Sequence, residues 1–387
     1  MRFQDIIGHQ DVKKHLIETY QSSRTAHAQI FLGPEGSGKL ALALAYIQYL
    51  LCENPTEEDS CGECNACKKV NRYIHPDVHF SYPTIGSKQV STNFVAEWRE
   101  LLKKTSYPVL NQWLNAIDAK NQQGNITKDE CVRIIKQFSL KKLEGNYKAL
   151  IMWLPEYLGK EGNRLLKLIE EPEPNTIFIF VAEQSSKILN TILSRCQIVR
   201  IPRLSDEQVQ EYLNTNLDIS PDKAIYLSQL AEGNLSKAIG LIDDAQDAYS
   251  QLLMTWLRVA YQGHAKLVLN WVDGILTGKD RKTKKATLRL SRKDQLAFLQ
   301  YGLHFFRQCL VHSYRTDANV AFLNEAESIF AQKLTTLLKL EHIQTIAKTL
   351  DENIYYIERN ANPKILFTEL TIALHKVFRK SRSQSVA

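Results

Sequence analysis

One stretch of eight residues decides the fold class, and it reads Gly33-Pro34-Glu35-Gly36-Ser37-Gly38-Lys39-Leu40. A glycine, four variable residues and then Gly-Lys are typical of a phosphate-binding loop, in which backbone N–H groups and the lysine surround the phosphates of a nucleotide. The apolar run Ile30 to Leu32 predicts a buried strand before the loop, and Leu40 to Leu51 predicts the helix after it. The candidate nucleotide-binding residues are therefore Gly33, Gly36, Gly38 and Lys39. The alternative is a glycine-rich turn that keeps the geometry of such a loop without a phosphate role.

The groups that hydrolyse a nucleotide are missing around this loop. Leu40 stands where a serine or threonine hydroxyl would ligate Mg²⁺. Hydrolysis also needs carboxylates at the end of a neighbouring strand, but the strand predicted over Ala149 to Trp153 leads into Trp153 and Leu154. We therefore predict a nucleotide-hydrolase fold that is not an enzyme on its own. Whether it still binds ATP or ADP stays open.

Short apolar runs predict a parallel sheet that is covered by helices on both faces, because the central strands of such sheets are apolar throughout. The five runs are Ala28 to Leu32, Val78 to Ser81, Ala149 to Trp153, Ile177 to Val181 and Gln197 to Ile201. They belong to an α/β domain over residues 1–203, which carries a long insertion at 87–145. Helical segments within the insertion are predicted near Phe94 to Lys103 and Asp129 to Leu143.

Only helical patterns follow Pro202, so the fold class is α/β plus all-α. Short helical segments predict a small lid over 204–245, and longer ones predict a helical domain over 246–378. The last predicted helix has one apolar face, formed by Leu366, Leu370, Ala373 and Val377. We expect this face to be buried by packing within the domain. The tail 379–387, rich in serine and basic residues, is predicted to be disordered.

Composition sets the broad class of the protein. A chain of 387 residues with 44% hydrophobic residues can form two or three globular domains. Without an apolar run of membrane-spanning length or a signal-peptide pattern, we expect a cytoplasmic protein with no membrane partner. Much of the net charge of +7 lies in the segment 279–293. This basic segment could meet nucleic acid, or it could be a solvated loop between two helices.

Four of the seven cysteines are closely spaced and predict a metal site. Cys52, Cys61, Cys64 and Cys67 follow a C-x8-C-x2-C-x2-C pattern, which suits a tetrahedral Zn²⁺ with a structural role. Four thiolates close the coordination sphere and leave no position for catalysis. Lys68 and Lys69 could offset the thiolate charge. Reduced thiols without a metal, or an iron–sulfur cluster, are the alternatives.

A third motif, Leu193-Ser194-Arg195-Cys196-Gln197, lies at the edge of the last predicted strand. Together with the phosphate loop and the four cysteines it makes a specific combination. The chain resembles the δ′ subunits of the bacterial DNA polymerase III clamp loader, a branch of the AAA+ family. Residues 1–245 carry the resemblance. Three more segments in this range are similar to the family's sequence: Phe3 to His9, His75 to Val78 and Asn163 to Pro172. It is thinner afterwards, where Arg359 to Pro363 is similar to the family's collar domain.

The resemblance implies a role for Arg195, which is flanked in the motif by Ser194 and Cys196. In that family this arginine reaches into the ATP site of a neighbouring subunit, where a guanidinium stabilises the charge that develops during phosphoryl transfer. The implied partners are the tau/gamma ATPase and delta subunits in a hetero-pentameric ring, together with the sliding clamp and primed DNA. The alternative is a structural arginine that caps a helix or pairs with a carboxylate.

The chain differs in two ways from the active clamp-loader ATPases, and two other functions were considered. Ser236 stands where active clamp-loader ATPases place a nucleotide-sensing arginine, and the insertion 87–145 has no assigned role. The runner-up function is a P-loop ATPase motor subunit of a replication or repair complex, with Glu156 as its second carboxylate. A free-standing DNA-binding protein that uses the basic segment and the cysteine module ranks last.

Overall fold

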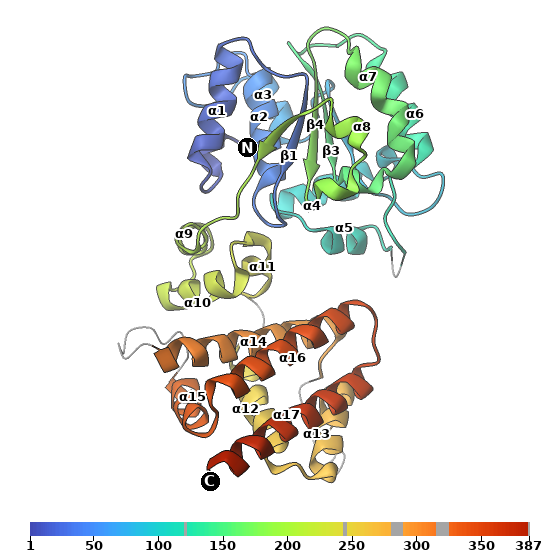
Figure 1. Ribbon diagram of the computed structural model, residues 1–387. Coiled ribbons are helices and arrows are strands. Elements are labelled where there is room, and N and C mark those ends of the chain that lie inside the picture. The colour runs from blue at the N-terminus through green and yellow to red at the C-terminus, as the bar shows by residue number, and fades with distance from the viewer. Residues whose placement is uncertain (120–121, 243–245, 280–288, 315–324, 386–387) are drawn as a thin grey trace. The chain divides into compact units, whose positions relative to one another are not determined.

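The computed structural model describes residues 1–119, 122–242, 246–279, 289–314 and 325–385 (Figure 1). Contacts divide the chain into two units, Met1–Ile242 and Asp243–Ala387. The predicted lid lies within the first unit, together with the sheet. We describe each unit by itself.

A five-stranded parallel sheet forms the centre of the first unit, with the strand order β2-β3-β4-β1-β5. The strands are β1 (Ala28–Leu32), β2 (Val78–Ser81), β3 (Lys148–Trp153), β4 (Thr176–Ala182) and β5 (Gln197–Arg200). All five predicted runs are strands, and their ends differ from the prediction by one residue at most. The central strands β3 and β4 are buried at every residue, because helices cover both faces of the sheet. The predicted α/β class is confirmed.

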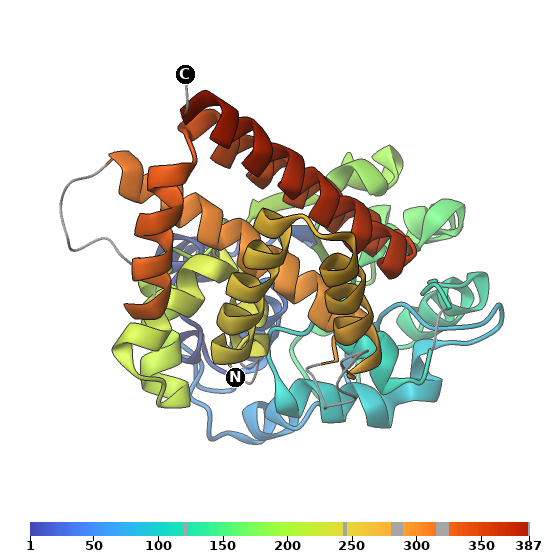
Figure 2. The ribbon, with the colours of Figure 1, turned by 90° about the horizontal axis from the view of Figure 1, so that it is seen from below.

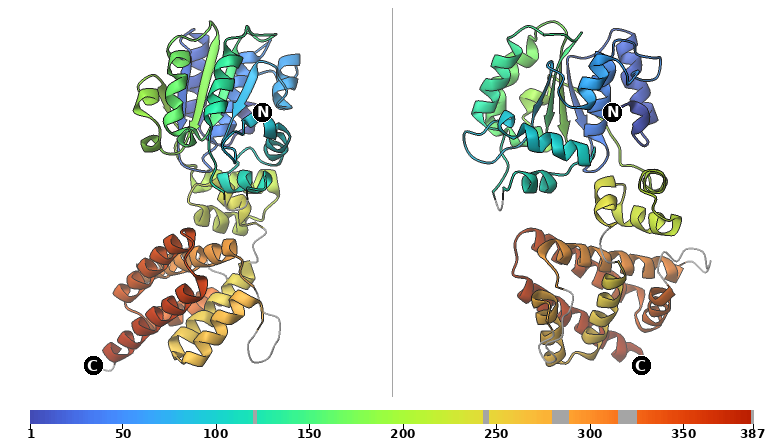
Figure 3. Two further views of the ribbon diagram at one scale, coloured as in Figure 1. Left: turned by 90° about the vertical axis from the view of Figure 1, so that its right-hand side faces the viewer. Right: turned by 180° about the vertical axis from the view of Figure 1, so that it is seen from behind.

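Helices lie on both sides of this sheet (Figures 1 and 3). One side holds α1 (Gln10–Gln21), α2 (Lys39–Leu51) and α3 (Asn65–Asn71), and the other holds α6 (Lys128–Phe138), α7 (Leu166–Glu170) and α8 (Asn190–Leu193). Short 3₁₀ turns connect the elements at η1 (Phe3–Asp5), η2 (Ser91–Phe94), η3 (Pro155–Tyr157), η4 (Gly159–Leu165) and η5 (Ser185–Lys187). The helix α2 that follows the glycine-rich loop is buried along its whole length, so the loop is attached to the most protected helix of the unit.

The described residues of the insertion 87–145 form three α-helices where the sequence predicts two helical segments. Helix α4 (Val95–Lys104) agrees with the prediction, α5 (Leu110–Ala116) was not predicted, and α6 ends at Phe138 rather than at Leu143. Lys148 explains the earlier end, because its Nζ donates to the carbonyls of Gln137 and Leu140 at 2.7 and 2.6 Å. The first bond satisfies a carbonyl of the last helical turn, and the second holds the residues that follow the helix next to β3.

Three helices follow β5 and form the lid region: α9 (Asp206–Leu217), α10 (Pro221–Ala231) and α11 (Leu235–Gly240). Their starts carry ordinary signals, since Ser205 and Gln208 form a capping box and Pro221 is the first residue of α10. The start of α11 is capped by Asn234, whose Oδ1 accepts the Lys237 N–H at 3.0 Å. This cap brings Asn234 next to the glycine-rich loop, as described below.

The described residues of the second unit form six helices and no strand: α12 (Gln246–Gln262), α13 (Ala265–Thr277), α14 (Arg292–Tyr314), α15 (Glu325–Leu337), α16 (Leu340–Glu358) and α17 (Pro363–Ser385). Helix α17 packs against α12, α13 and α16 (Figure 2). In the core, the Trp256 and Trp271 rings stack at 5.4 Å, and Trp256 Nε1 donates to Thr371 Oγ1 at 2.8 Å. The predicted all-α class of this region is confirmed.

The buried face of α17 differs in part from the predicted one. Leu366 and Leu370 are buried as predicted, but Leu374 and Phe378 continue that face, while Ala373 and Val377 are only half-buried. Phe367 and Thr371 are buried as well, so the buried face is wider than the predicted one and keeps spacings of three and four residues. The helix turns this stripe toward α12, α13 and α16 together.

The prediction of a disordered tail is wrong for residues 379–385, which continue α17. The Arg382 guanidinium lies 3.7 Å from the centre of the Tyr261 ring and donates to the Tyr261 carbonyl at 2.8 Å. Ser381 Oγ donates to the Leu337 carbonyl. Contacts with α12 and α15 therefore hold the last turns of the helix, and a composition rich in serine and basic residues does not reveal them.

Two further predictions concern surfaces. Most of the basic segment, residues 280–288, lies outside the described residues. Among the helices that the structure describes, none has both the length and the apolar character needed to cross a membrane.

We predict that Asp77 stabilises the first unit in a pH-dependent way. Its carboxylate accepts the backbone N–H groups of Leu143, Glu144 and Gly145 at 2.7 to 2.8 Å. Burial alone raises the pKa of Asp77, but these three donors outweigh it and hold the pKa below its usual value. The Asp77→Asn variant should lose about 2 kcal/mol of unfolding free energy at pH 7.

Because the folded-state pKa is depressed, this stabilisation is fully present above the unfolded value of about 3.9 and is lost as pH falls through the folded value. Urea unfolding of Asp77→Asn and wild type should therefore converge in acid. Asp351→Asn, which changes an exposed carboxylate on α16, is the control and should match wild type at every pH. Equal stability of Asp77→Asn and wild type at pH 7 would contradict this role.

Candidate functional site

The four residues predicted to bind phosphate lie together in the loop between β1 and α2. Gly33 N–H donates to the Ala182 carbonyl of β4 at 3.2 Å, which ties the loop to the sheet. Gly36 and Gly38 have φ angles of 71° and 88°, in the left-handed region that favours glycine. Gly38 is also the N-cap residue of α2. The loop thus has the strand–loop–helix context that a phosphate-binding motif requires.

Lys39 is held by its own loop. Its Nζ donates to the Pro34 carbonyl at 2.6 Å and lies 3.9 Å from Oε1 of Glu183, which follows β4. Burial lowers the pKa of Lys39, and the Glu183 carboxylate opposes this shift. Burial likewise raises the pKa of Glu183. The lysine charge is therefore partly balanced inside the protein.

Apolar packing fills the positions where a hydrolase has catalytic groups. Leu40 is 3% exposed, and the Trp153 ring packs against Trp98 of α4 with centroids 5.3 Å apart. Leu154 is buried, with its N–H donated to the Val181 carbonyl at 2.9 Å. Leucine and tryptophan side chains offer no oxygen to Mg²⁺.

The structure also places Glu156 and Ser236, the two other residues that the sequence analysis singled out near the nucleotide site. Oε1 of Glu156, the alternative second carboxylate, accepts the backbone N–H groups of Glu183 and Gln184 at 2.5 and 2.8 Å. It therefore caps the end of β4. Ser236, at the position of the sensing arginine, is buried in α11.

The four predicted cysteines come together as one cluster. Their sulfur atoms all lie within 4.8 Å of one another, with Cys52 after α2, Cys67 on α3, and Cys61 and Cys64 in the segment between. A tetrahedral Zn²⁺ with bonds of about 2.3 Å to sulfur needs sulfur atoms about 3.8 Å apart. The distances from Cys61 Sγ to the sulfurs of Cys52 and Cys67 are 3.4 and 4.0 Å. The donor set therefore fits a closed four-sulfur metal site.

Backbone groups support this cluster as they support metal-bound thiolates. The N–H groups of Cys61, Cys64 and Cys67 point to the sulfurs of Cys52, Cys61 and Cys64 at 3.2 to 3.4 Å. Backbone donors from Cys64 and Glu63 lower the pKa of Cys61 to about 7, while burial raises the pKa of Cys52 and Cys67. A bound cation would keep the two buried sulfurs as thiolates.

Lys69, which was predicted to offset the charge of the thiolates, forms an ion pair with a carboxylate of the insertion. Its Nζ contacts the Glu144 carboxylate at 2.6 Å. The lysine therefore links α3 to the return segment of the insertion.

Arg195 is at the end of α8 with its side chain 36% exposed. Its Nε pairs with the Glu170 carboxylate of α7, and its NH1 donates to the Thr191 carbonyl at 2.9 Å and to Ser194 Oγ at 3.2 Å. Cys196 packs partly buried against the sheet core, and burial raises its pKa to about 12. An ion pair this exposed contributes about 0–1 kcal/mol, so the guanidinium can change partner at little cost.

Two residues that contact the phosphate loop were not predicted from the sequence to do so. Asn234 of the lid touches Gly36, and Tyr107 of the insertion touches Gly38. Asn234 had a local signal, because Gly233 and Asn234 are typical of a helix start. Tyr107 had none, since only the fold brings residue 107 to residue 38.

Comparison with known proteins assigns the family. The model of the family described as DNA polymerase III, delta subunit, matches residues 8–205. The chain belongs to this family. The resemblance inferred from the phosphate loop, the cysteines and the Ser-Arg-Cys motif is thereby confirmed.

Named relatives include two kinds of subunit. The chain is 27% identical over 258 residues to the DNA polymerase III subunit delta' of Bacillus subtilis, covering 66% of each chain. It is 26% identical over 327 residues to subunit tau of the same organism, covering 80% of this chain and 50% of that one. The subunit delta' of Haemophilus influenzae is 24% identical over 338 residues, covering 86% of each. The chain thus spans about half to two thirds of the length of the Bacillus relatives that it matches.

Proposed function

We propose that this chain is a δ′-type subunit of a cytoplasmic DNA polymerase III clamp loader. It does not hydrolyse ATP, and it presents Arg195 to the ATP site of a neighbouring subunit while the ring loads a sliding clamp onto primed DNA. The observation that carries the proposal is the burial of Leu40, Trp153 and Leu154 at the catalytic positions of a domain that keeps an exposed Arg195.

The residues around the phosphate loop bear on whether the chain can hydrolyse ATP. Phosphoryl transfer depends on a metal that bridges the phosphates and on a group that orients the attacking water. Leu40 offers no hydroxyl to a metal, and Trp153 and Leu154 are packed into the core. Oε1 of Glu156 accepts two backbone N–H groups, which hold this carboxylate at the end of β4, three residues beyond Trp153. These facts support a non-hydrolysing subunit over the alternative motor ATPase.

The setting of Arg195 supports a role toward a neighbour. A guanidinium is always charged and can donate several hydrogen bonds to phosphate oxygens, which suits it to stabilise a transition state across a subunit boundary. Ser194 accepts one of its N–H groups, and the partly buried Cys196 anchors the end of the same turn. Arg195 can exchange the exposed Glu170 carboxylate for a phosphate without disturbing the core.

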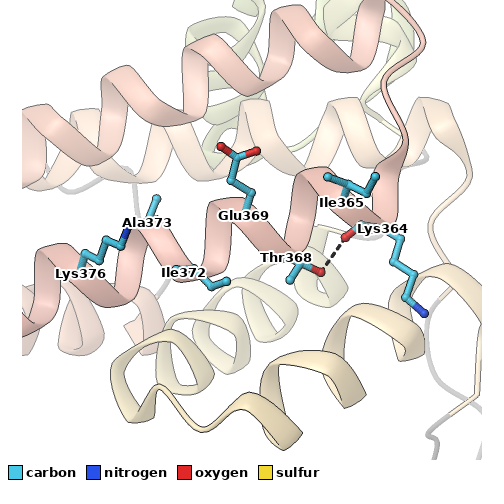
Figure 4. Close-up of a pocket in the computed structure, with 7 residues that line it drawn as sticks. All are labelled: Lys364, Ile365, Thr368, Glu369, Ile372, Ala373 and Lys376. Atoms are coloured by element: carbon cyan, nitrogen blue, oxygen red, sulfur yellow. Dashed lines mark hydrogen bonds between the residues drawn. The ribbon is translucent and has the colours of Figure 1, made fainter.

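The second unit supplies a surface for assembly. Along the outer side of α17, Ile365 and Ile372 are 66% and 46% exposed. They line a groove of about 540 Å³ together with Lys364, Thr368, Glu369, Ala373 and Lys376 (Figure 4). We assign this face to a neighbouring subunit in a hetero-pentameric ring with tau/gamma and delta subunits, because the two isoleucines line one continuous groove and a contiguous apolar surface is typical of a protein contact site.

The cysteine cluster is assigned one structural Zn²⁺. Cys52, Cys61, Cys64 and Cys67 would hold it, and four sulfurs leave no open position for substrate. The ion would fix α3 to the end of α2. It would thereby hold the segment before β2 in place.

We predict that an assembled loader carrying Arg195→Ala loses ATP hydrolysis and clamp loading by a factor of about 10³ or more at the site that this residue serves. Steady-state ATPase and loading assays on the purified complex measure both. Arg200→Ala, which removes an exposed arginine from β5, is the matched control and should keep wild-type rates. Gel filtration should show intact rings for both variants. Unchanged hydrolysis and loading by intact Arg195→Ala rings would refute the role of this residue in trans.

We also predict one zinc per chain. Metal analysis of gently purified protein should give a ratio near one in the wild type and near zero in Cys64→Ala, with a lower melting temperature for the variant. Cys309→Ala removes a buried cysteine of the second unit and should keep the metal, although its core is weakened. Wild-type protein without metal, or Cys64→Ala with a full complement, would contradict the assignment.

A further inference from the structure

In a phosphate-binding loop, glycines leave space beside the backbone N–H groups for phosphate oxygens. Gly36 and Gly38 provide such space in this chain, because both adopt positive φ and neither has a side chain. Side chains from two distant segments lie against these glycines. One comes from the lid and the other from the insertion.

Asn234 of the lid occupies the space at Gly36. A Cβ atom on Gly36 would lie 1.8 Å from Asn234 Oδ1, so the amide is in direct contact with the glycine. Asn234 Nδ2 donates to Glu35 Oε1 at 3.1 Å, and the Leu235 N–H donates to the Gly36 carbonyl at 3.2 Å. Because Asn234 is also the N-cap of α11, the start of that helix is bonded directly to the loop.

Tyr107 of the insertion occupies the space at Gly38. A Cβ atom on Gly38 would lie 3.0 Å from Tyr107 Cε1, and the tyrosine is only 5% exposed. Its ring also meets Tyr212 of α9, with centroids 5.9 Å apart at 74°. Tyr107 therefore stands between the phosphate loop and the lid, in contact with both.

The segment that carries Tyr107 is firmly held. It connects α4 to α5, and these helices bring Trp98 and Trp113 against Tyr82 with ring centroids 4.3 and 4.7 Å away. Trp113 Nε1 donates to the Pro83 carbonyl at 2.6 Å. Trp98 also packs on Trp153, which stands at a catalytic position of a hydrolase. One aromatic cluster thus replaces the catalytic carboxylates and fixes the position of Tyr107.

Electrostatics at the loop also oppose a triphosphate. The Glu183, Glu156 and Glu35 carboxylates all act on the Lys39 charge, and Lys39 already donates to the Pro34 carbonyl. A polyanion entering here would meet three carboxylates in a partly desolvated setting, where repulsion is stronger than in water. It would also have to displace the Tyr107 ring and the Asn234 amide.

We propose that Tyr107 of the insertion and Asn234 of the lid together cap the phosphate loop and keep nucleotide out. In this proposal the insertion serves to exclude nucleotide from the loop. The loop itself serves to bond the lid to the sheet. The inference deepens the proposed function by answering whether the loop binds ATP, but it does not depend on ring assembly or on Arg195.

Equilibrium dialysis of the isolated full-length chain with radiolabelled ATP tests the cap. Wild type should show no saturable binding up to about 1 mM ATP. Tyr107→Ala opens the side at Gly38 and should bind at least about tenfold more tightly than wild type. Tyr107→Phe keeps the ring and should behave as wild type does. Binding gained by Tyr107→Ala should be independent of Mg²⁺, because Leu40 supplies no ligand, and should vanish when Lys39→Ala is added.

A second variant covers the case in which Tyr107→Ala does not fold. Asn234→Gly opens the side at Gly36, and glycine is an acceptable N-cap residue, so the start of α11 should be kept. Circular dichroism establishes which variants are folded. Tight ATP binding by wild type, or folded Tyr107→Ala and Asn234→Gly proteins that both bind no ATP, would overturn the cap. Neither outcome affects the test of Arg195, which is made on the assembled complex.

Discussion

The bonds that the phosphate loop makes within its own chain are the constraint on which the rest of the first unit depends. Lys39 Nζ donates to the Pro34 carbonyl, and the Gly36 carbonyl accepts the Leu235 N–H. A loop of this type ordinarily exposes its donors to phosphate oxygens. Here the same backbone serves as the junction between the sheet, the insertion and the lid.

The loss of catalytic groups and the packing of the insertion have one structural cause. Trp153 stands where a hydrolase needs a carboxylate, and its indole packs on Trp98 of the insertion. An aromatic residue at this position gives up metal binding and gains buried contact area. Arg195 follows α8 and lies outside this aromatic cluster, where its side chain is 36% exposed. This arrangement is the basis for proposing that the chain acts on a neighbour's nucleotide without binding one itself.

Local patterns predicted the sheet and the cysteine cluster well. The strands of a covered parallel sheet are continuous apolar runs, and Ala149 to Trp153 is one such run within a strand that is buried at every residue. Cys61, Cys64 and Cys67 lie within seven residues, so their spacing almost fixes their geometry. Long-range contacts were not predictable in this way. Arg382 extends the last helix by stacking on Tyr261, and Tyr107 reaches Gly38 from 69 positions along the chain.

The measurement that tests the account most directly is multiple-turnover ATP hydrolysis by the purified chain alone, in Mg²⁺, with Lys39→Ala as the background control. The account predicts that wild type and Lys39→Ala release phosphate at the same rate, indistinguishable from buffer. Turnover by wild type in the range of about 1 s⁻¹ or faster, abolished by Lys39→Ala, would contradict it.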